Sequence, residues 1–150
     1  MTEKEFEIKY KLYNKILYSI IYGYTLNKED SDDLLQDVFI KYLKSNKIFN
    51  NQDEEKYYLI RITINTCNDY YKHNKNKSYL EYDPVDEKND NMILKHIIKN
   101  LPKKYKEVII MYYYESLDIN SISNILKISV SSTKKRLERA RNKIKEEIGE

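Results

Sequence analysis

The 150-residue chain is long enough for one medium-sized domain or two small ones. It has only two Gly and two Pro, which favours helices over tight turns, and its net charge of +3 hides 27 basic and 24 acidic side chains. The single cysteine excludes an intrachain disulfide, and the charged N-terminus and the absence of a long apolar run predict a cytoplasmic protein with no membrane insertion.

The first half of the chain shows three stretches of helical periodicity, in residues 1–25, in 32–44 and from about 54 to 73. In the second stretch Asp33 and Asp37, one turn apart, fall on the side opposite the apolar residues. The segment 45–55 breaks the pattern and predicts a loop. We expect Cys67 in the core. The three apolar stripes are Phe6, Tyr10, Tyr13, Leu17, Ile20 and Tyr24; Leu34, Leu35, Val38, Phe39, Tyr42 and Leu43; and Leu59, Ile62, Thr66 and Tyr70.

The segment 75–91 is polar, contains Pro84 and has no sustained period, so we predict a flexible linker. Helical patterns resume at 92–100 and continue through 103–116. No strand pattern is strong. The fold class predicted is therefore all-α, with two small helical domains, 1–74 and 92–150, joined by the linker. We expect each domain to have its own core, with no continuous core that joins Leu17 to Ile125.

The end of the chain predicts a helix-turn-helix. Asp118 can cap a short helix, and Ser129 can cap a second one from about Val130. Lys127 stands in the turn, where Gly is usual, and a left-handed backbone there costs about 1 kcal/mol. The second helix has a narrow apolar stripe and presents Lys135 and Arg139 on the other side, a shape that suits the DNA major groove. The stripe is Val130, Thr133, Leu137, Ala140, Ile144 and Ile148.

Basic side chains are concentrated in this second half. Residues 92–150 have 13 basic and 7 acidic side chains, whereas residues 1–74 have 11 and 12. A positively charged end of the molecule is suited to binding a polyanion. The alternative, for any basic run, is that the cations simply form the solvent-exposed face of a helix. Because the caps, the stripe and the cations occur together, we predict nucleic-acid binding, with Ser and Lys near the helix start at base edges and later cations at phosphates.

These segments, in this order, resemble compact bacterial RNA polymerase sigma factors of the extracytoplasmic-function type, which keep only sigma domains 2 and 4. "EDSDDLLQDVFIKYLK" resembles the part of domain 2 that docks on the clamp helices of the polymerase, and "YYLIRITINTCNDYYK" resembles the next helix. "LPKKYKEVIIMYYYES" and "SISNILKISVSSTKKRLERARNKI" resemble domain 4. The resemblance implies an alternative sigma factor that binds core RNA polymerase and directs promoter-specific transcription initiation.

The resemblance also implies roles for individual residues. Asp33, Gln36 and Asp37 would face core RNA polymerase, although acids on a helix can simply aid solubility. The 45–51 loop sits where the family captures a flipped base of the minus-10 element. The implied minus-10 residues are Phe49, Asn50, Asn51, Arg61, Asn65 and Lys72. The sequence does not choose among Phe49, Asn50 and Asn51 as the residue that binds the base. For Asn65, helix-to-helix hydrogen bonding is the alternative. The implied minus-35 set is Ser131, Ser132, Lys134, Lys135, Arg136, Arg139 and Lys143.

Other classes of function have less support. A helix-turn-helix regulator that does not recruit core polymerase is the alternative, but it would have no use for the acidic 33–37 face. The sequence has no phosphate loop, nucleophile–base set or metal-ligand spacing, so we expect no enzyme activity, cofactor or metal. The resemblance implies an anti-sigma partner that could clamp the two domains together. Ser116, like Lys127, stands where Gly is frequent in the family, and the tyrosines of "MYYYES" are expected in the core.

Overall fold

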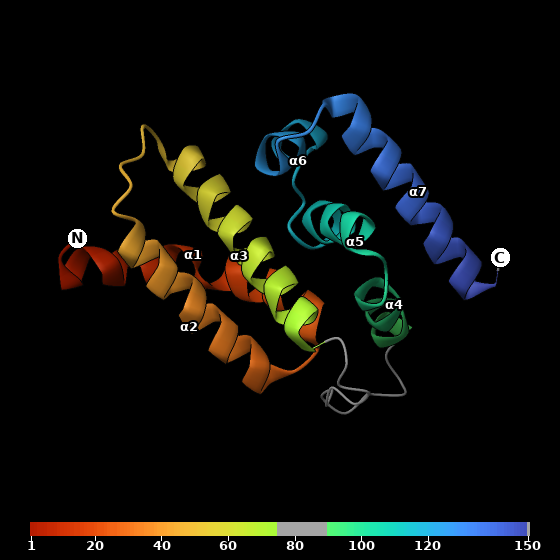
Figure 1. Ribbon diagram of the computed structural model, residues 1–150, viewed down its shortest axis with the longest axis horizontal. Helices are drawn as coiled ribbons and strands as arrows, with labels where there is room; N and C mark the ends of the chain where they lie inside the picture. Colours follow the sequence, from red (N-terminus) through yellow and green to blue (C-terminus); the bar gives the residue numbers. More distant parts are fainter. Residues whose placement is uncertain (75–89, 150) are drawn as a thin grey trace.

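The computed structural model describes residues 1–74 and 90–149. The N-terminal half (residues 1–74) contains three helices, and the C-terminal half (residues 90–149) contains four more and one π-helical turn. Figure 1 shows these halves as two groups, with α7 on the side away from α1–α3. The elements are α1 (Glu3–Thr25), α2 (Lys28–Ser45), α3 (Gln52–Asn74), α4 (Asp90–Lys99), α5 (Lys103–Ile109), η1 (Ile110–Tyr114), α6 (Ile119–Leu126) and α7 (Val130–Ile148).

The prediction of an all-α fold with two helical parts is confirmed, and no strand occurs in the described ranges. The predicted linker lies outside the described residues except at positions 90 and 91, which begin α4. One local feature differs from the prediction. The helix expected through 103–116 changes into the π-helical turn η1 at Ile110, and Ser116 then adopts a left-handed backbone with φ of 53°.

Side chains cap the helix starts as their sequences favour. Thr2 and Glu5 form a capping box at the start of α1, in which Thr2 Oγ1 accepts a hydrogen bond from the Glu5 amide at 3.1 Å. Asn27 Oδ1 accepts one from the Asp30 amide at 2.8 Å at the start of α2. Each such cap contributes about 1 kcal/mol, because it satisfies an amide that has no partner within the helix. Local sequence therefore fixes where these helices begin.

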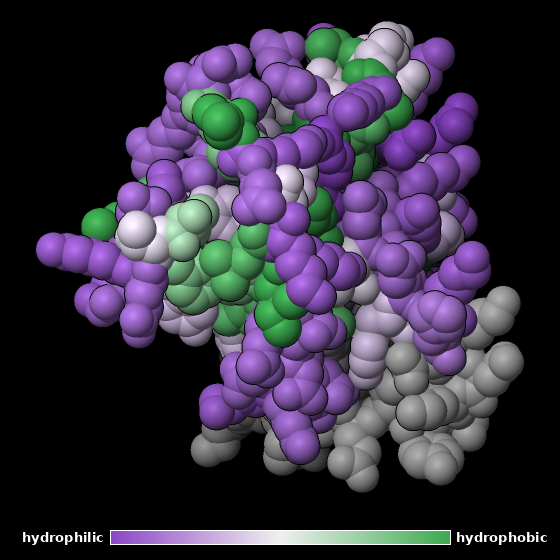
Figure 2. Space-filling model, turned by 60° about the vertical axis from the view of Figure 1, so that its left-hand side comes forward, coloured by the Kyte–Doolittle hydropathy of each residue, from purple (hydrophilic) through white to green (hydrophobic). Residues whose placement is uncertain are grey.

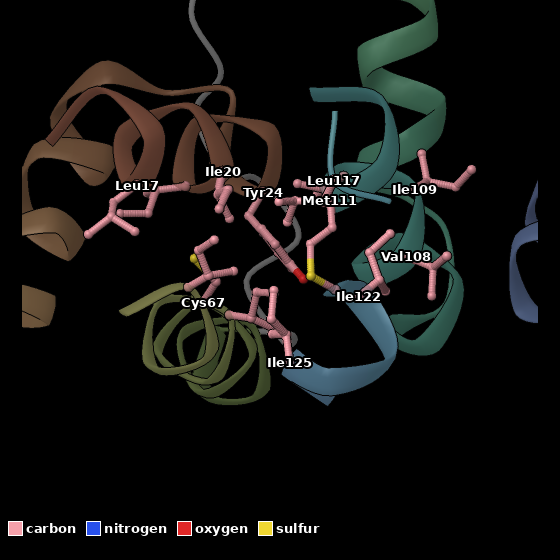
Figure 3. Packing of buried hydrophobic residues seen from close by; sticks show 14 of the residues in the cluster. Leu17, Ile20, Tyr24, Cys67, Val108, Ile109, Met111, Leu117, Ile122 and Ile125 are labelled. Carbon is pink, nitrogen blue, oxygen red and sulfur yellow. The ribbon is translucent and has the colours of Figure 1, made fainter. Parts of the chain in front are cut away.

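The prediction that the two halves have separate cores is wrong. Leu17 and Ile125 belong to one continuous cluster of buried side chains. Figure 3 shows Tyr24 of α1 reaching toward Met111 and Ile122 of the C-terminal half. The predicted apolar row of α3 is incomplete, because Ile60 and Ile64 are also buried, at 0% and 2% exposed. Cys67, at 0% exposed, lies in the core as expected. A helix buried on more than one side packs against more than one neighbour, and α3 contacts α1, α2 and α6.

A few residues assigned to the buried stripes are exposed instead. Tyr10 and Leu43 are each 40% exposed, Val130 is 37% exposed and Ile148 is 52% exposed. Val130 and Ile148 are the first and last residues of α7, where the helix extends beyond its neighbours. The middle of that stripe, Thr133, Leu137 and Ala140, is buried as predicted.

Candidate nucleic-acid interface

The predicted helix-turn-helix is formed by α6, a turn at residues 127–129, and α7. Asp118 caps α6 by accepting a hydrogen bond from the Ser121 amide at 2.7 Å, which lowers the pKa of its carboxyl group. Ser129 caps α7 by accepting one from the Ser132 amide at 3.0 Å. Lys127 has the expected left-handed backbone, with φ of 57° and ψ of 45°. The two caps and this turn set the angle at which α7 leaves α6.

The outer side of α7 is exposed along most of its length. Of the predicted minus-35 residues only Arg136 is half-buried, and the exposed ones are Ser131, Ser132, Lys134, Lys135, Arg139 and Lys143. Not every cation of the basic run is equally available. Arg141 donates from Nε to Tyr113 Oη at 2.8 Å and lies 5.3 Å from the ring centre of Tyr112, so it links α7 to η1. The hydrogen bond to Tyr113 raises the pKa of this guanidinium further above its ordinary value.

The loop between α2 and α3 borders a pocket of about 700 Å³. Phe49, Asn51 and Arg61 of the predicted minus-10 set line this pocket, while Asn50 does not. Tyr58 is not among the predicted minus-10 residues, but it also lines this pocket and contacts three of its other residues. Its ring is 5.3 Å from that of Phe49, and Lys47 Nζ and Arg61 Cζ lie 4.5 and 5.7 Å from its centre. Aromatic rings beside cations are the groups that stack nucleic-acid bases and attract their phosphates.

The remaining minus-10 candidates lie elsewhere on α3 or act in the fold. Asn51 Oδ1 accepts a hydrogen bond from the Glu54 amide at 2.8 Å, so it also caps α3. Asn65 is exposed and lines a second pocket, of about 350 Å³, together with Arg61 and with Lys127 and Arg136 of the C-terminal half. Lys72 is exposed near the C-terminal end of α3 and lines neither pocket.

A buried carboxylate at the start of α3 fixes this end of the N-terminal half. Glu55 is 6% exposed and accepts hydrogen bonds from Lys9 Nζ at 2.8 Å, Tyr13 Oη at 2.9 Å and Tyr42 Oη at 2.8 Å. Burial alone would raise the pKa of Glu55, but these three donors together hold it below its ordinary value. Burial and the nearby carboxylate raise the pKa of Tyr13 and Tyr42. This cluster could not be predicted from the sequence, because its members come from three different helices.

The predicted polymerase-binding residues share one exposed face of α2. Asp33, Gln36 and Asp37 are all exposed, and Ile40 and Leu43 on the same helix are each 40% exposed. The spacing of Asp33, Asp37 and Ile40 by four and three places them on one side of the helix. Figure 2, which turns the left-hand side of Figure 1 forward, shows an apolar area surrounded by hydrophilic side chains. Exposed apolar residues beside charged ones are typical of a protein-binding surface.

Two further kinds of feature are absent from residues 1–74 and 90–149. No group of three or more His, Cys, Asp or Glu side chains that could hold a metal ion is present among them. None of the helices in these ranges is long and apolar enough to cross a membrane. Cys67 is buried, and this burial raises the pKa of its thiol.

Comparison with known proteins agrees with this geometry. Residues 10–77 match the family model described as Sigma-70 region 2, and residues 91–144 match the one described as Sigma-70, region 4. The chain is 34% identical over 126 residues to the RNA polymerase sigma factor SigZ of Bacillus subtilis (strain 168), an alignment that covers 77% of this chain and 70% of SigZ. The chain belongs to the RNA polymerase sigma factors. It is also 25% identical to the ECF RNA polymerase sigma factor SigM of the same organism, over 91% of this chain and 90% of SigM.

Solved structures show the same fold as this sigma factor. CnrH in complex with the cytosolic domain of CnrY matches 98% of this chain and 89% of its own, with a TM-score of 0.77 and 18% identity. The sigma factor RpoE in complex with the anti-sigma factor NepR, from Bartonella quintana, matches 95% of this chain and 96% of its own, with a TM-score of 0.72 and 20% identity. The arrangement of both halves, not only of each half, therefore has counterparts of known structure.

The two family matches divide this sigma factor at the segment predicted to be a linker. The region 2 match contains the exposed face of α2, the 46–51 loop and all of α3, and the region 4 match contains α4 to α6 and most of α7. The function predicted from the resemblance, an alternative sigma factor that directs transcription initiation, is confirmed at the level of the family. Tyr58 and Ile40 were not predicted as binding residues. The sequence shows that Tyr58 is aromatic and that Ile40 is apolar, but it does not show that either side chain reaches the surface.

Proposed function

We propose that this sigma factor binds core RNA polymerase with the exposed face of α2, and reads promoter DNA with the 46–51 loop, α3 and α7. The observation that carries the proposal is that one chain contains both region 2 and region 4, at residues 10–77 and 91–144. A regulator that only bound DNA would need region 4 alone. We assign residues 1–74 to sigma domain 2, 75–91 to the linker and 92–150 to sigma domain 4.

The α2 face supports the first part of this proposal. Asp33, Gln36 and Asp37 supply polar and acidic contacts, and Ile40 adds an apolar group that is already exposed to solvent. Apolar groups at the centre of an interface contribute most of its affinity, while charges around them set orientation and association rate. We therefore extend the predicted polymerase-binding set to include Ile40.

The DNA contacts divide between the two halves. Phe49, Asn50, Asn51 and Arg61 lie on or beside the loop, where a base extruded from the minus-10 element could meet Tyr58. Asn65 and Lys72 extend this surface along α3. On α7, Ser131, Ser132, Lys134 and Lys135 are close to the helix start, where a helix in the major groove brings side chains to base edges. Arg136, Arg139 and Lys143 then follow at the distance of the phosphates.

Further properties follow from the same proposal. The chain acts in the cytoplasm, where the polymerase is, and regulates initiation without an enzymatic activity of its own. The relatives of known structure were determined with CnrY and with the anti-sigma factor NepR. We infer by analogy that an anti-sigma factor also binds this chain.

Run-off transcription with purified core RNA polymerase and a library of genomic fragments tests the function. We expect discrete transcripts only when the chain and the core enzyme are both present, and co-purification of the chain with core. Core enzyme alone is the control. If the chain bound DNA fragments specifically but neither joined core nor supported transcription, the alternative of a DNA-binding regulator would replace this proposal.

A further inference from the structure

Basic side chains from several elements converge on the pocket of about 350 Å³ beside α3, which we call the cationic pocket. Its lining includes five cations and a single carboxylate, that of Glu107, which is an excess of four positive charges. The cations come from α3, from the start of α5, from the turn before α7 and from α7 itself; they are Arg61, Lys103, Lys104, Lys127 and Arg136. Charges of one sign around a small concave space attract a compact ion of the opposite sign.

The chain does not neutralise these cations itself. The ion pairs found among the described residues lie elsewhere, and none involves a basic side chain of the cationic pocket. Glu107, which is 6% exposed, accepts a hydrogen bond from Asn68 Nδ2 at 2.8 Å. Arg61 and Arg136 are half-buried, so water screens their charges less than it screens those of the exposed lysines. A guanidinium group in such a place is suited to a phosphate, which it can bind with two parallel hydrogen bonds.

The size and charge of the cationic pocket suit a small anion with two phosphoryl groups. Pockets that bind small molecules have volumes of about 300–1,000 Å³, and this one lies within that range. A phosphoryl group has a charge of about −1.5 to −2 near pH 7, so two linked groups come close to balancing the pocket. A DNA strand needs cations spaced along its length, as on the outer face of α7, whereas these converge from different elements. A free diphosphate therefore fits the pocket better than a DNA backbone does.

An aromatic surface lies directly beside the cationic pocket. The pocket of about 700 Å³ that Phe49, Tyr57 and Tyr58 line, here called the aromatic pocket, shares Arg61 and Ile125 with the cationic pocket. Arg61 Cζ is 5.7 Å from the ring centre of Tyr58. A diphosphate in the cationic pocket would therefore place an attached base close to rings on which a base can stack.

We propose that the two pockets together bind a nucleoside diphosphate, with its phosphates among the cations and its base on Tyr58. Arg61 borders both pockets and contacts the phosphates next to the sugar. Nucleotide binding goes beyond the proposed function, because it needs neither core polymerase nor promoter DNA. One consequence does rest on that function: Tyr58 and Arg61 also belong to the proposed minus-10 surface, so the nucleotide competes with the extruded promoter base.

Calorimetric titration of the free, full-length chain tests the binding with three probes: ADP, inorganic pyrophosphate and adenosine. We expect pyrophosphate to bind, and ADP to bind at least about fivefold more tightly, the factor that about 1 kcal/mol of base stacking gives. Adenosine should bind most weakly, and the affinity for ADP should fall as salt is raised from about 50 to about 200 mM. Absence of ADP and pyrophosphate binding at the lower salt concentration would overturn the proposal.

A double variant tests the phosphate subsite. Lys103→Ala with Lys104→Ala removes two exposed cations that have no assigned role in DNA binding. We expect at least about tenfold weaker binding of both ADP and pyrophosphate, because hydrogen bonds to charged groups are lost. Lys4→Ala with Lys15→Ala removes the same charge from exposed positions of α1 and is the matched control. Equal weakening in the two double variants would mean non-specific attraction by net charge, and would overturn the proposal.

A second variant keeps this test decisive if the α5 double variant folds poorly by circular dichroism. Lys127→Asn removes a cation of the same pocket from a different element, and asparagine tolerates the left-handed backbone that Lys127 has. It should also weaken both ADP and pyrophosphate. Unchanged binding of both ligands in Lys127→Asn and in the α5 double variant would reject the cationic pocket as their site.

Tyr58→Leu tests the base subsite separately. We expect the affinity for ADP to fall to that for pyrophosphate, while pyrophosphate itself binds as in the parent chain. An unchanged preference for ADP over pyrophosphate would reject the stacking of the base on Tyr58.

Randomised single-stranded 12-mer DNA distinguishes a nucleotide from the DNA backbone as the source of the phosphates. If DNA binding required Lys103 and Lys104 while ADP and pyrophosphate did not bind, the pocket would be a DNA contact and the proposal would be wrong. Failure of the chain to support run-off transcription would reject the proposed function and leave nucleotide binding intact, so the two failures are distinguishable.

Discussion

Glu55 is a buried carboxylate whose three hydrogen-bond donors come from α1 and α2. Glu55→Ala would leave the ammonium group of Lys9 and two tyrosine hydroxyls without this acceptor, at a site next to the 46–51 loop. We expect a loss of about 3 kcal/mol in the free energy of unfolding, because breaking a buried charge pair leaves the other partners desolvated. Urea denaturation measures it. Asp53→Asn, an exposed change two residues away, should cost less than about 0.5 kcal/mol.

The same residue predicts the acid sensitivity of the N-terminal half. The folded-state pKa of Glu55 is below its ordinary value, so its stabilisation is present above the ordinary pKa and is lost as pH falls through the folded pKa. The parent chain should therefore lose more stability between neutral pH and acid than Glu55→Ala does. Denaturation midpoints at several acidic pH values measure this difference, and parallel curves for the two proteins would contradict the assignment.

Two basic residues of α7 are expected to contribute differently to DNA binding: Lys135 to the preference for particular bases, and Arg139 to the attraction of any DNA sequence. Lys135→Ala should cost about 1–3 kcal/mol at the preferred minus-35 sequence and change which base is preferred. Arg139→Ala should weaken all sequences alike and reduce the salt dependence by about one unit of slope. Reconstituted holoenzyme is assayed on a minus-35 library at several salt concentrations, with the exposed Lys145→Ala as the control. A base preference that changes with Arg139 but not with Lys135 would mean that α7 is rotated differently in the groove.

Among the elements, α6 and α7 were the most predictable. Asp118 and Ser129 cap these helices as their positions in the sequence indicate, and Lys127 has the left-handed backbone that the short turn requires. Such features depend on residues three or four apart, which a sequence shows directly. The π-helical turn at Ile110 was not predictable in this way. Its tyrosines have an unremarkable helical pattern, and their environment depends on contacts with α1 and α7.

The exposed face of α2 supports a prediction about polymerase binding. Asp37→Lys reverses a charge in the middle of this face, and Ile40→Ala removes its apolar group; each should weaken core binding by at least about tenfold, as loss of an interface anchor does. Helicity should persist, because Lys and Ala are good helix formers. Titration of labelled core enzyme measures the affinity. Glu7→Lys, the same charge reversal on an exposed position of α1, is the control, and unchanged core binding by both α2 variants would contradict the proposal.

At the scale of the whole molecule, sequence periodicity predicted the buried side of most helices but not how the halves pack together. The stripes of α1 and α2 are largely correct and Cys67 is buried as expected, whereas the burial of Ile60 and Ile64 on α3 and of Lys99 and Lys106 was not predicted. A lysine in a helix is expected to be exposed unless its partners are known, and the tyrosine rings beside Lys99 and Lys106 are at least 28 positions away in the sequence. The joint core could therefore be found only from the three-dimensional arrangement.

The buried lysines make the stability of the folded chain sensitive to pH. Burial lowers the pKa of Lys99 and of Lys106 to about 8 from 10.5. For Lys106 the nearby Lys99 acts in the same direction, while Cys67 and Glu107 oppose it. Other groups packed near these ammonium groups are the rings of Tyr24 and Tyr71. When the chain unfolds, each lysine regains its ordinary pKa. Unfolding therefore takes up protons between about pH 8 and pH 10.5, and the folded chain becomes more stable as pH rises through this window.

We therefore expect the free chain to become more stable between pH 7.5 and pH 9.5, by about 1–2 kcal/mol. Denaturation midpoints measure the change. The range stops below pH 10 because buried tyrosines act in the opposite direction: burial raises the pKa of Tyr24, so its hydroxyl ionises more readily once exposed. Lys106→Met keeps the apolar stem without the charge, and it should raise stability at pH 7.5 and flatten the pH dependence. If stability fell steadily from pH 7.5 to pH 9.5 in the parent and in Lys106→Met alike, these lysines would not be the cause of its pH dependence.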